Sequence, residues 1–258
     1  MSSPIWTPAA LRSEAHAYSG KGWRLVEAQH LVSTQKLVDT ADEQEALEDI
    51  LETTKPPVPA GCRHLDYLLS TPFRYRPYPF GSRFRRAGIT PGVWYGAERP
   101  ETAVAEMAFY RLLFFAESPD TPFPDNAADY TAFSASLHVD RALDLTAGGL
   151  AADAALWTHP TDYEACQLLS ETARAAGVGL IRYCSVRDPD GGMNVAVLTC
   201  AAFASPVPLD RQSWRIRIAV SGIQAMRDFP RLRLEFSPAT FASDPRLAAM
   251  DWNRFRGH

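Results

Sequence analysis

Five arginines lie within thirteen residues of a chain that is acidic overall. The chain has 258 residues, with 26 Lys and Arg against 30 Asp and Glu, and a formal net charge of -4. A guanidinium can hold a phosphate through two parallel hydrogen bonds, and it stays charged when partly buried. The stretch therefore predicts either a local anion site or, in the alternative, an arginine-rich surface loop. The five residues are Arg74, Arg76, Arg83, Arg85 and Arg86.

A single carboxylate, Glu106, stands among small and apolar residues. Ala-Val-Ala precedes it at 103–105 and Met-Ala-Phe follows it at 107–109. A lone carboxylate in such surroundings costs free energy unless it is paired, so a functional carboxylate that faces a cleft would explain it. The same residue could instead lie on the polar, exposed side of its helix, and the sequence does not decide between the two.

Two later polar residues, Ser185 and Asn194, flank a predicted hairpin. Each could donate a hydrogen bond into a cleft. Ser and Asn are also common in turns and at strand ends for purely structural reasons, so both interpretations stay open.

Several widespread catalytic patterns are absent from the sequence. It contains no G-x-G-x-x-G, no Walker A loop, no H-E-x-x-H and no G-x-S-x-G. Cys62 and His64 could form half of a metal site, but no second half lies nearby, so we expect no metal. The candidates are therefore the arginine-rich stretch, Glu106 and the late Ser and Asn.

Helices and short strands must position these residues. Pro100 and an early Glu favour a helix over 101–115, and a capping-box spacing at Thr161–Glu164 predicts a second helix that ends near Gly177. The irregular mixture of elements indicates an α+β fold rather than a doubly wound sheet. Apolar patterning predicts strands over 93–96, 130–139, 143–145, 181–186, 195–198, 214–220 and 232–236, the fourth and fifth forming a hairpin.

The first 60 residues indicate a polar, helical extension packed on a main domain at 61–258. Weak helical periodicity runs from Val26 to Val38. Thr40 and Glu43 have capping-box spacing ahead of a second helical segment, and a proline-rich connector at 55–61 ends that segment.

The cysteines and the N-terminus suggest a compartment. The four cysteines are widely spaced without a C-x-x-C pair, no signal peptide is visible, and no stretch approaches 18 consecutive apolar residues. We therefore expect free thiols in a reducing cytoplasm and no membrane partner.

Five segments, in order, resemble the RES domain family, which is named for Arg, Glu and Ser. The resemblance runs from about residue 63 to residue 205, and Thr71–Tyr75 is similar to a longer subgroup with a helical N-terminal extension. The part beyond about residue 205 lies outside the match. The segments are Gly81–Phe84, Gly92–Tyr95, Glu101–Glu106, Gly179–Asp188 and Asn194–Leu198.

The resemblance implies an ADP-ribosyltransferase-like fold, with a mixed or antiparallel sheet core and flanking helices. RES proteins are typically toxins of bacterial toxin–antitoxin pairs, and they consume NAD by hydrolysis or phosphorolysis. Their partner is usually a helix-turn-helix antitoxin of the Xre type. NAD would be the substrate, so no cofactor is expected.

The resemblance also assigns roles to residues by motif. It implies Glu106, Arg74 and Ser185 as catalytic, because cleavage of the nicotinamide–ribose bond creates a cation-like sugar that a fixed carboxylate can stabilise. Arginines would hold the diphosphate, a tyrosine would pack on the nicotinamide ring, and Ser185 would orient the substrate. The residues implied to bind NAD are Arg74, Tyr75, Arg83, Tyr95, Ser185 and Asn194.

Two alternatives remain. The protein could transfer ADP-ribose to a protein side chain, since the sequence does not identify the acceptor. It could also be a non-catalytic module that binds a partner or nucleic acid through C-terminal arginines, but Asp210, Asp228 and Glu235 interrupt that charge. We therefore expect no direct nucleic-acid binding.

Overall fold

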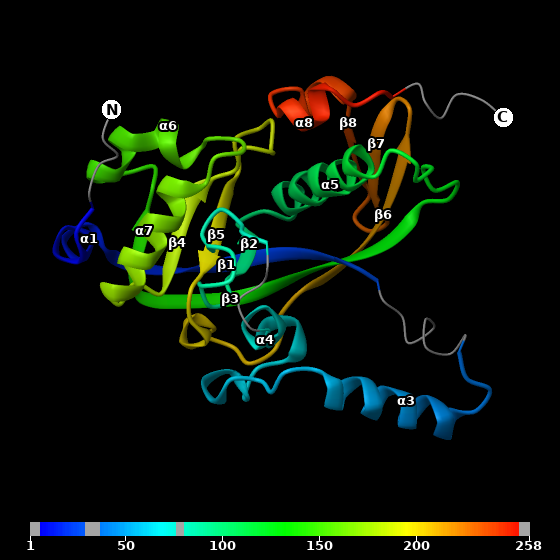
Figure 1. Ribbon diagram of the computed structural model, residues 1–258, viewed down its shortest axis with the longest axis horizontal. Helices are drawn as coiled ribbons and strands as arrows, with labels where there is room; N and C mark the ends of the chain where they lie inside the picture. Colours follow the sequence, from blue (N-terminus) through cyan, green and yellow to red (C-terminus); the bar gives the residue numbers. More distant parts are fainter. Residues whose placement is uncertain (1–5, 29–36, 76–79, 253–258) are drawn as a thin grey trace.

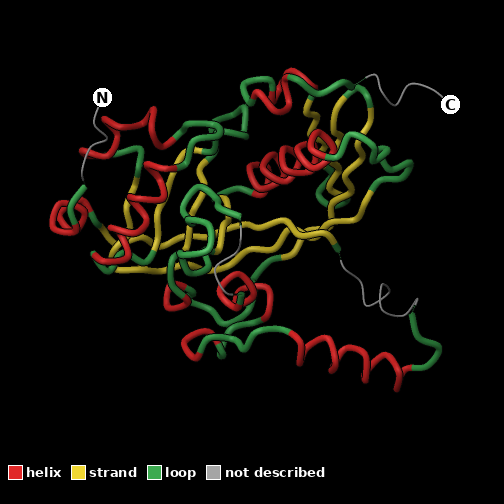
Figure 2. Tube along the Cα trace, viewed as in Figure 1, coloured by secondary structure: helices red, strands yellow, loops and turns green. Residues whose placement is uncertain are grey.

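A mixed eight-stranded sheet forms the centre of the protein (Figures 1 and 2). The computed structural model describes residues 6–28, 37–75 and 80–252. The sheet order is β1-β2-β5-β4-β3-β6-β7-β8. The strands are β1 (His16–Glu27), β2 (Trp94–Ala97), β3 (Ala128–Asp144), β4 (Leu180–Cys184), β5 (Met193–Val197), β6 (Arg211–Ala219), β7 (Gly222–Arg227) and β8 (Leu232–Phe236).

Helices pack around this sheet, and together the elements confirm the predicted α+β class. None of the described helices has both the length and the apolar character that a membrane crossing needs. The α-helices are α1 (Pro8–Glu14), α3 (Ala41–Thr54), α4 (Tyr67–Arg74), α5 (Pro100–Glu117), α6 (Ala154–Trp157), α7 (Glu164–Ala175) and α8 (Pro245–Ala248). Short 3-10 turns are η1 (Ala60–Cys62), η2 (Gly148–Asp153), η3 (Cys200–Ala202) and η4 (Pro238–Phe241).

Five strands close into a ring, because β1 pairs with β3 as well as with β2. The two long strands β1 and β3 lie side by side along the long axis of the molecule (Figure 1), in register from His16↔Ala142 to Glu27↔Tyr130. The pairing of β3 with β4 is parallel, and the other pairings are antiparallel. This arrangement agrees with the mixed or antiparallel sheet that the resemblance to RES domains implies.

The long strand β3 divides the interior because its two faces alternate between two apolar clusters. Phe133, Ala135 and Leu137 belong to the cluster that also contains residues of η1 and α4. Tyr130 and Ala132 belong to the cluster formed with α5 and β6–β8. The predicted strands at 130–139 and 143–145 are one continuous strand in the structure.

Helix α5 carries Glu106 and is apolar on most sides because other elements cover it. Pro100 lies in its first turn with Glu101, as predicted. Val104, Ala108 and Leu112 are fully buried in the cluster that includes β6–β8 and α8. Figure 1 shows α5 between α8 and the long strands. A rigid, buried helix therefore fixes the backbone of Glu106.

The N-terminal region is only partly helical. Helices α1 and α3 confirm the helical prediction, and Thr40 and Glu43 form the predicted capping box. Residues 16–27, however, form β1, so this part belongs to the central sheet rather than to a helical extension. Val26 pairs with Thr131 in the sheet, and residues 29–36 of the predicted periodic segment lie outside the described residues.

The second predicted helix begins later than its capping-box spacing indicates. The helix predicted from Thr161 begins as α7 at Glu164, and the side chain of its N-cap residue, Tyr163, makes no capping hydrogen bond. Instead, Nδ1 of His159 accepts hydrogen bonds from the backbone amides of residues 161 and 162. The C-terminal end is confirmed, since Gly177 has a positive φ of 75°.

The cysteine prediction is wrong for one pair. Cys62 and Cys200 form a disulfide that joins η1 to η3, and only Cys166 and Cys184 are free. The two bonded cysteines are buried in the same apolar cluster. The wide sequence spacing concealed this pair because β3, β4 and β5 bring the two turns together.

The arginine-bearing strands of the C-terminal region behave as the alternation predicts. Trp214, Ile216 and Ile218 of β6 are buried while the intervening arginines are exposed. Arg215 pairs with Asp129 and Asp228. Carboxylates of β3 and of the turn between β7 and β8 therefore offset part of this positive charge. Strand β7, which lies between the two predicted strands, was not predicted.

Candidate active site

Glu106, Ser185 and Asn194 meet at one point of the fold. Oε1 of Glu106 accepts a 2.7 Å hydrogen bond from the Ser185 hydroxyl and a 2.6 Å bond from Nδ2 of Asn194. Glu106 is half-buried, whereas Ser185 and Asn194 are 4% and 2% exposed. The structure thus brings together three of the residues that the sequence singled out and fixes the orientation of the carboxylate.

The second carboxylate oxygen of Glu106 is differently placed. No hydrogen bond from the residues that the structure describes reaches Oε2, since both donors bind Oε1. Oδ1 of Asn194 is also buried without a hydrogen-bond partner among the described residues. A buried acceptor without a donor costs free energy unless a ligand or water supplies one. These two oxygens are therefore the free acceptors of the cluster.

The loop after β4 holds Ser185 in place. Its hydroxyl oxygen accepts hydrogen bonds from the backbone amides of Arg187 and Asp188, at 3.1 and 3.0 Å. Asp188 in turn accepts a 2.7 Å hydrogen bond from Thr102 in the first turn of α5. The loop and the helix that carries Glu106 are therefore joined directly, which fixes the distance between Ser185 and Glu106.

Strand pairing positions Asn194. It lies on β5 opposite Tyr183 of β4 and Ala97 of β2. Burial raises the pKa of Tyr183 well above its usual value, and the nearby charge of Glu106 adds to the effect while Arg83 opposes it. Tyr183 therefore stays protonated.

Arg83 is a buried cation beside this cluster. It is 8% exposed, donates a 2.6 Å hydrogen bond to the carbonyl of Trp157, and its guanidinium lies 4.7 Å from the ring centre of Tyr163. Among the described residues, no carboxylate forms an ion pair with it. A buried guanidinium in this state can accept an anion without first breaking an ion pair.

Tyr95 holds the turn that carries Arg83. Its hydroxyl accepts a hydrogen bond from the backbone amide of Phe84 at 3.0 Å and shares a 2.8 Å hydrogen bond with Ser82. Burial raises the pKa of Tyr95, so the phenol stays neutral. The turn is fixed from the other side by α7, because Gln167 donates to the carbonyls of Ser82 and Arg85.

The first arginine of the predicted set is engaged elsewhere. Arg74 lies at the end of α4, where it forms a 2.6 Å ion pair with Glu52 of α3 and a hydrogen bond with the carbonyl of Pro56. No described contact joins Arg74 to Glu106 or Arg83. Tyr75, the next residue, is 37% exposed. The structure therefore does not bring this pair into the cluster, and its role in ligand binding stays a prediction.

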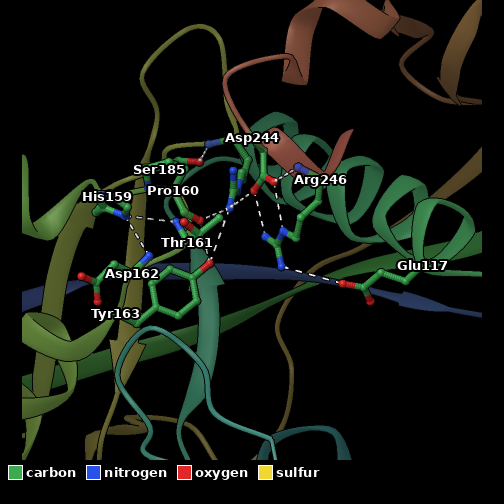
Figure 3. A network of polar contacts seen from close by, with 10 residues as sticks. Glu117, His159, Pro160, Thr161, Asp162, Tyr163, Ser185, Asp244 and Arg246 are labelled. Carbon is green, nitrogen blue, oxygen red and sulfur yellow. Dashed lines mark hydrogen bonds and ion pairs between the residues drawn. The ribbon is translucent and has the colours of Figure 1, made fainter. Parts of the chain in front are cut away.

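The sequence reasoning missed a second buried arginine, Arg187, and its partner. Nη2 of Arg187 lies 3.1 Å from Oδ2 of Asp244, and both side chains are almost completely buried. Asp244 also pairs with Arg246, as Figure 3 shows. Asp244 followed by Pro245 is a typical helix N-cap pattern, so the sequence could have predicted the start of α8. The contact between Asp244 and Arg187, however, depends on the tertiary fold.

The described residues contain no group of His, Cys, Asp and Glu that could hold a metal ion. Cys62, half of the metal site considered from sequence, is bonded to Cys200. Glu106 supplies an oriented carboxylate to the site and Arg83 supplies a buried cation, beside the neutral donors and acceptors of Ser185, Asn194 and Tyr163.

Comparisons with known proteins identify the family of this chain. A chain of the crystal structure of the M. tuberculosis MbcT–MbcA toxin–antitoxin complex aligns at 14% identity and a TM-score of 0.43, covering 93% of this chain and 97% of that chain. No curated protein matches. The RES domain family model matches residues 58–219, which is more than half of the chain and includes Glu106, Ser185 and Asn194. The chain therefore belongs to the RES domain family.

Proposed function

We propose that this protein cleaves the nicotinamide–ribose bond of NAD, by hydrolysis or phosphorolysis, as the toxin of a bacterial toxin–antitoxin pair. The observation that carries the proposal is the convergence of Glu106 with Ser185 and Asn194. The resemblance to RES toxins supplies the substrate, and the geometry supplies a role for each residue.

Glu106 stabilises the transition state in this proposal. Departure of nicotinamide leaves positive charge on the ribose, and a preorganised carboxylate lowers the energy of that charge. Ser185 and Asn194 hold Oε1, so Oε2 faces the sugar or one of its hydroxyls. The hydrogen bonds also mean that the carboxylate needs no reorientation during the reaction.

Arg83 holds the diphosphate. It is buried and has no carboxylate partner among the described residues. The hydroxyl of Tyr163, whose ring faces Arg83, lies 3.5 Å from Nη2 of Arg187 on the loop that carries Ser185. Tyr163 lies against the guanidinium of Arg83 and keeps the planar group in one orientation. Tyr95 acts mainly by fixing the turn of Arg83, because Ser82 and Phe84 occupy its hydroxyl.

Product analysis tests the proposal directly. Purified protein is mixed with NAD labelled in the adenine, with and without phosphate, and the products are resolved. Free ADP-ribose indicates hydrolysis, ADP-ribose 1''-phosphate indicates phosphorolysis, and labelled protein indicates transfer of ADP-ribose. The proposal fails if the protein releases no nicotinamide under any of these conditions while a well-folded state is confirmed by circular dichroism.

The cellular part of the proposal has its own test. A cytoplasmic toxin should arrest growth and deplete NAD when it is expressed without its antitoxin, and Glu106→Gln should abolish both effects. The expected antitoxin is a helix-turn-helix protein of the Xre type, and its co-expression should restore growth. Normal NAD levels during expression of the soluble parent protein would contradict this role.

A further inference from the structure

The C-terminal segment reaches the candidate active site through one buried ion pair. Asp244, at the N-cap of α8, is fully buried, and its carboxylate lies 3.1 Å from Nη2 of Arg187. Arg187 is the second residue after Ser185 on the same loop. Through Arg187, a carboxylate near the C-terminus therefore contacts the loop whose Ser185 is hydrogen-bonded to Glu106.

Arg187 connects three parts of the site. Its backbone amide donates to the Ser185 hydroxyl. Its guanidinium lies 3.6 Å from the ring centre of Phe109, three residues after Glu106 on α5. The same guanidinium donates a 2.6 Å hydrogen bond to the carbonyl of Pro160, in the segment that presents Tyr163 to Arg83. Movement of Arg187 would therefore disturb all three.

Asp244 is in turn held firmly. Arg246 donates to both of its carboxylate oxygens at 3.0 and 2.8 Å, and the backbone amide of residue 246 donates to Oδ1. Figure 3 shows Asp244 and Arg246 on one side of this network, with Ser185, Pro160 and Tyr163 on the other. Asp244 is the carboxylate that pairs with the buried Arg187, so loss of its charge would leave this guanidinium without its ion pair, which costs free energy in the interior.

We infer that Asp244 is a positioning residue for the reaction at Glu106, acting through Arg187 on Ser185 and Tyr163. The inference rests on the proposed function. It gives the region beyond residue 205 a role in turnover and not only in folding.

The experiment compares Asp244→Asn with Asp228→Asn. The control makes the same chemical change in an ion pair with Arg215 whose two side chains are 56% and 51% exposed. Asp244→Asn should lower kcat for NAD cleavage by roughly tenfold to a hundredfold, as expected for a displaced catalytic group, and should change KM much less. Asp228→Asn should leave both parameters at the parental values. Asp244→Glu, which restores the charge, should recover part of the lost kcat.

Two further measurements keep the inference testable. Arg187→Lys keeps the charge but loses the planar contact with Phe109, and should lower kcat in the same way even if Asp244→Asn does not fold. Amide hydrogen exchange over residues 185–192 should accelerate in Asp244→Asn and not in Asp228→Asn.

The outcomes separate the two proposals. If the parent protein cleaves no NAD, the proposed function is wrong. The hydrogen-exchange measurement would still decide whether Asp244 orders the loop that carries Ser185. An active parent together with parental kcat and parental exchange in folded Asp244→Asn would overturn the positioning role. An equal loss of kcat in Asp228→Asn would overturn it as well.

Discussion

The hydroxyl of Ser185 donates a 2.7 Å hydrogen bond to Oε1 of Glu106, although 79 residues separate the two in sequence. The same hydroxyl oxygen accepts two backbone amides of its own loop. Ser185 therefore transmits the position of the loop to the carboxylate. The orientation of Glu106 therefore depends on contacts between α5 and the loop after β4, which are distant in sequence.

Replacement of Glu106 by Gln should remove most of the turnover. The amide keeps the size of the side chain but loses the negative charge that stabilises the cation-like sugar. We expect kcat for nicotinamide release to fall by about a hundredfold or more, as on loss of one preorganised stabilising group, with little change in KM. Equal rates for Glu106→Gln and the parent protein would exclude Glu106 as the central carboxylate.

Ser185→Ala should lower both activity and stability. The substitution removes a donor to Glu106 and leaves the amides of Arg187 and Asp188 buried without their acceptor, which costs about 1–3 kcal/mol. Urea denaturation should show this loss in the free energy of unfolding. Ser237→Ala, at an exposed serine, serves as control and should change the same quantity by less than about 0.5 kcal/mol.

The two arginines of the motif should differ in their effect on KM. Arg83→Gln removes a charge-assisted contact with the diphosphate, worth about 1.5–3 kcal/mol, so KM for NAD should rise roughly tenfold to a hundredfold. Arg74→Gln should change KM little, because Arg74 is engaged with Glu52. A comparable rise in KM for Arg74→Gln would show that Arg74 also takes part in NAD binding.

The disulfide should contribute to stability under oxidising conditions. Cys62 and Cys200 are 138 residues apart, so their bond restricts a large loop of the unfolded chain. The double variant Cys62→Ser/Cys200→Ser should lose about 2–4 kcal/mol in the free energy of unfolding without reductant. Alkylation of the denatured, unreduced parent protein should modify Cys166 and Cys184 alone. Modification of all four cysteines would show that the bond is absent.

Stability should fall in acid partly through Asp244. Burial alone would raise the pKa of this carboxyl, but the hydrogen bonds and charge of Arg246, with the charge of Arg187, hold it below the usual value. A carboxyl with a lowered pKa stabilises the fold above the unfolded pKa of about 4, and this contribution is lost as pH falls through the folded pKa. Urea denaturation at pH 7, 5 and 3 should therefore show that the stability difference between parent and Asp244→Asn shrinks in acid. A constant difference would contradict the shift.

Much of the local structure was readable from the sequence. Pro100 and the early Glu101 predict the start of α5. The alternation from 214 to 218 predicts β6 with its exposed arginines, because alternation along a strand reflects which of its two faces is buried. Strand β1 was missed. Its residues His16–Glu27 include two glycines and several polar residues, and they form a strand because β3 offers a long partner edge, which is a tertiary influence.

The sequence by itself determined the residue types of the site, the family they resemble and the elements that carry them. Only the tertiary structure decided that Glu106, Ser185 and Asn194 meet, that Arg74 pairs with Glu52, and that Asp244 pairs with Arg187. The physical reason is range: periodicity and capping act over a few residues, whereas hydrogen bonds and ion pairs between distant residues depend on how the strands and helices pack.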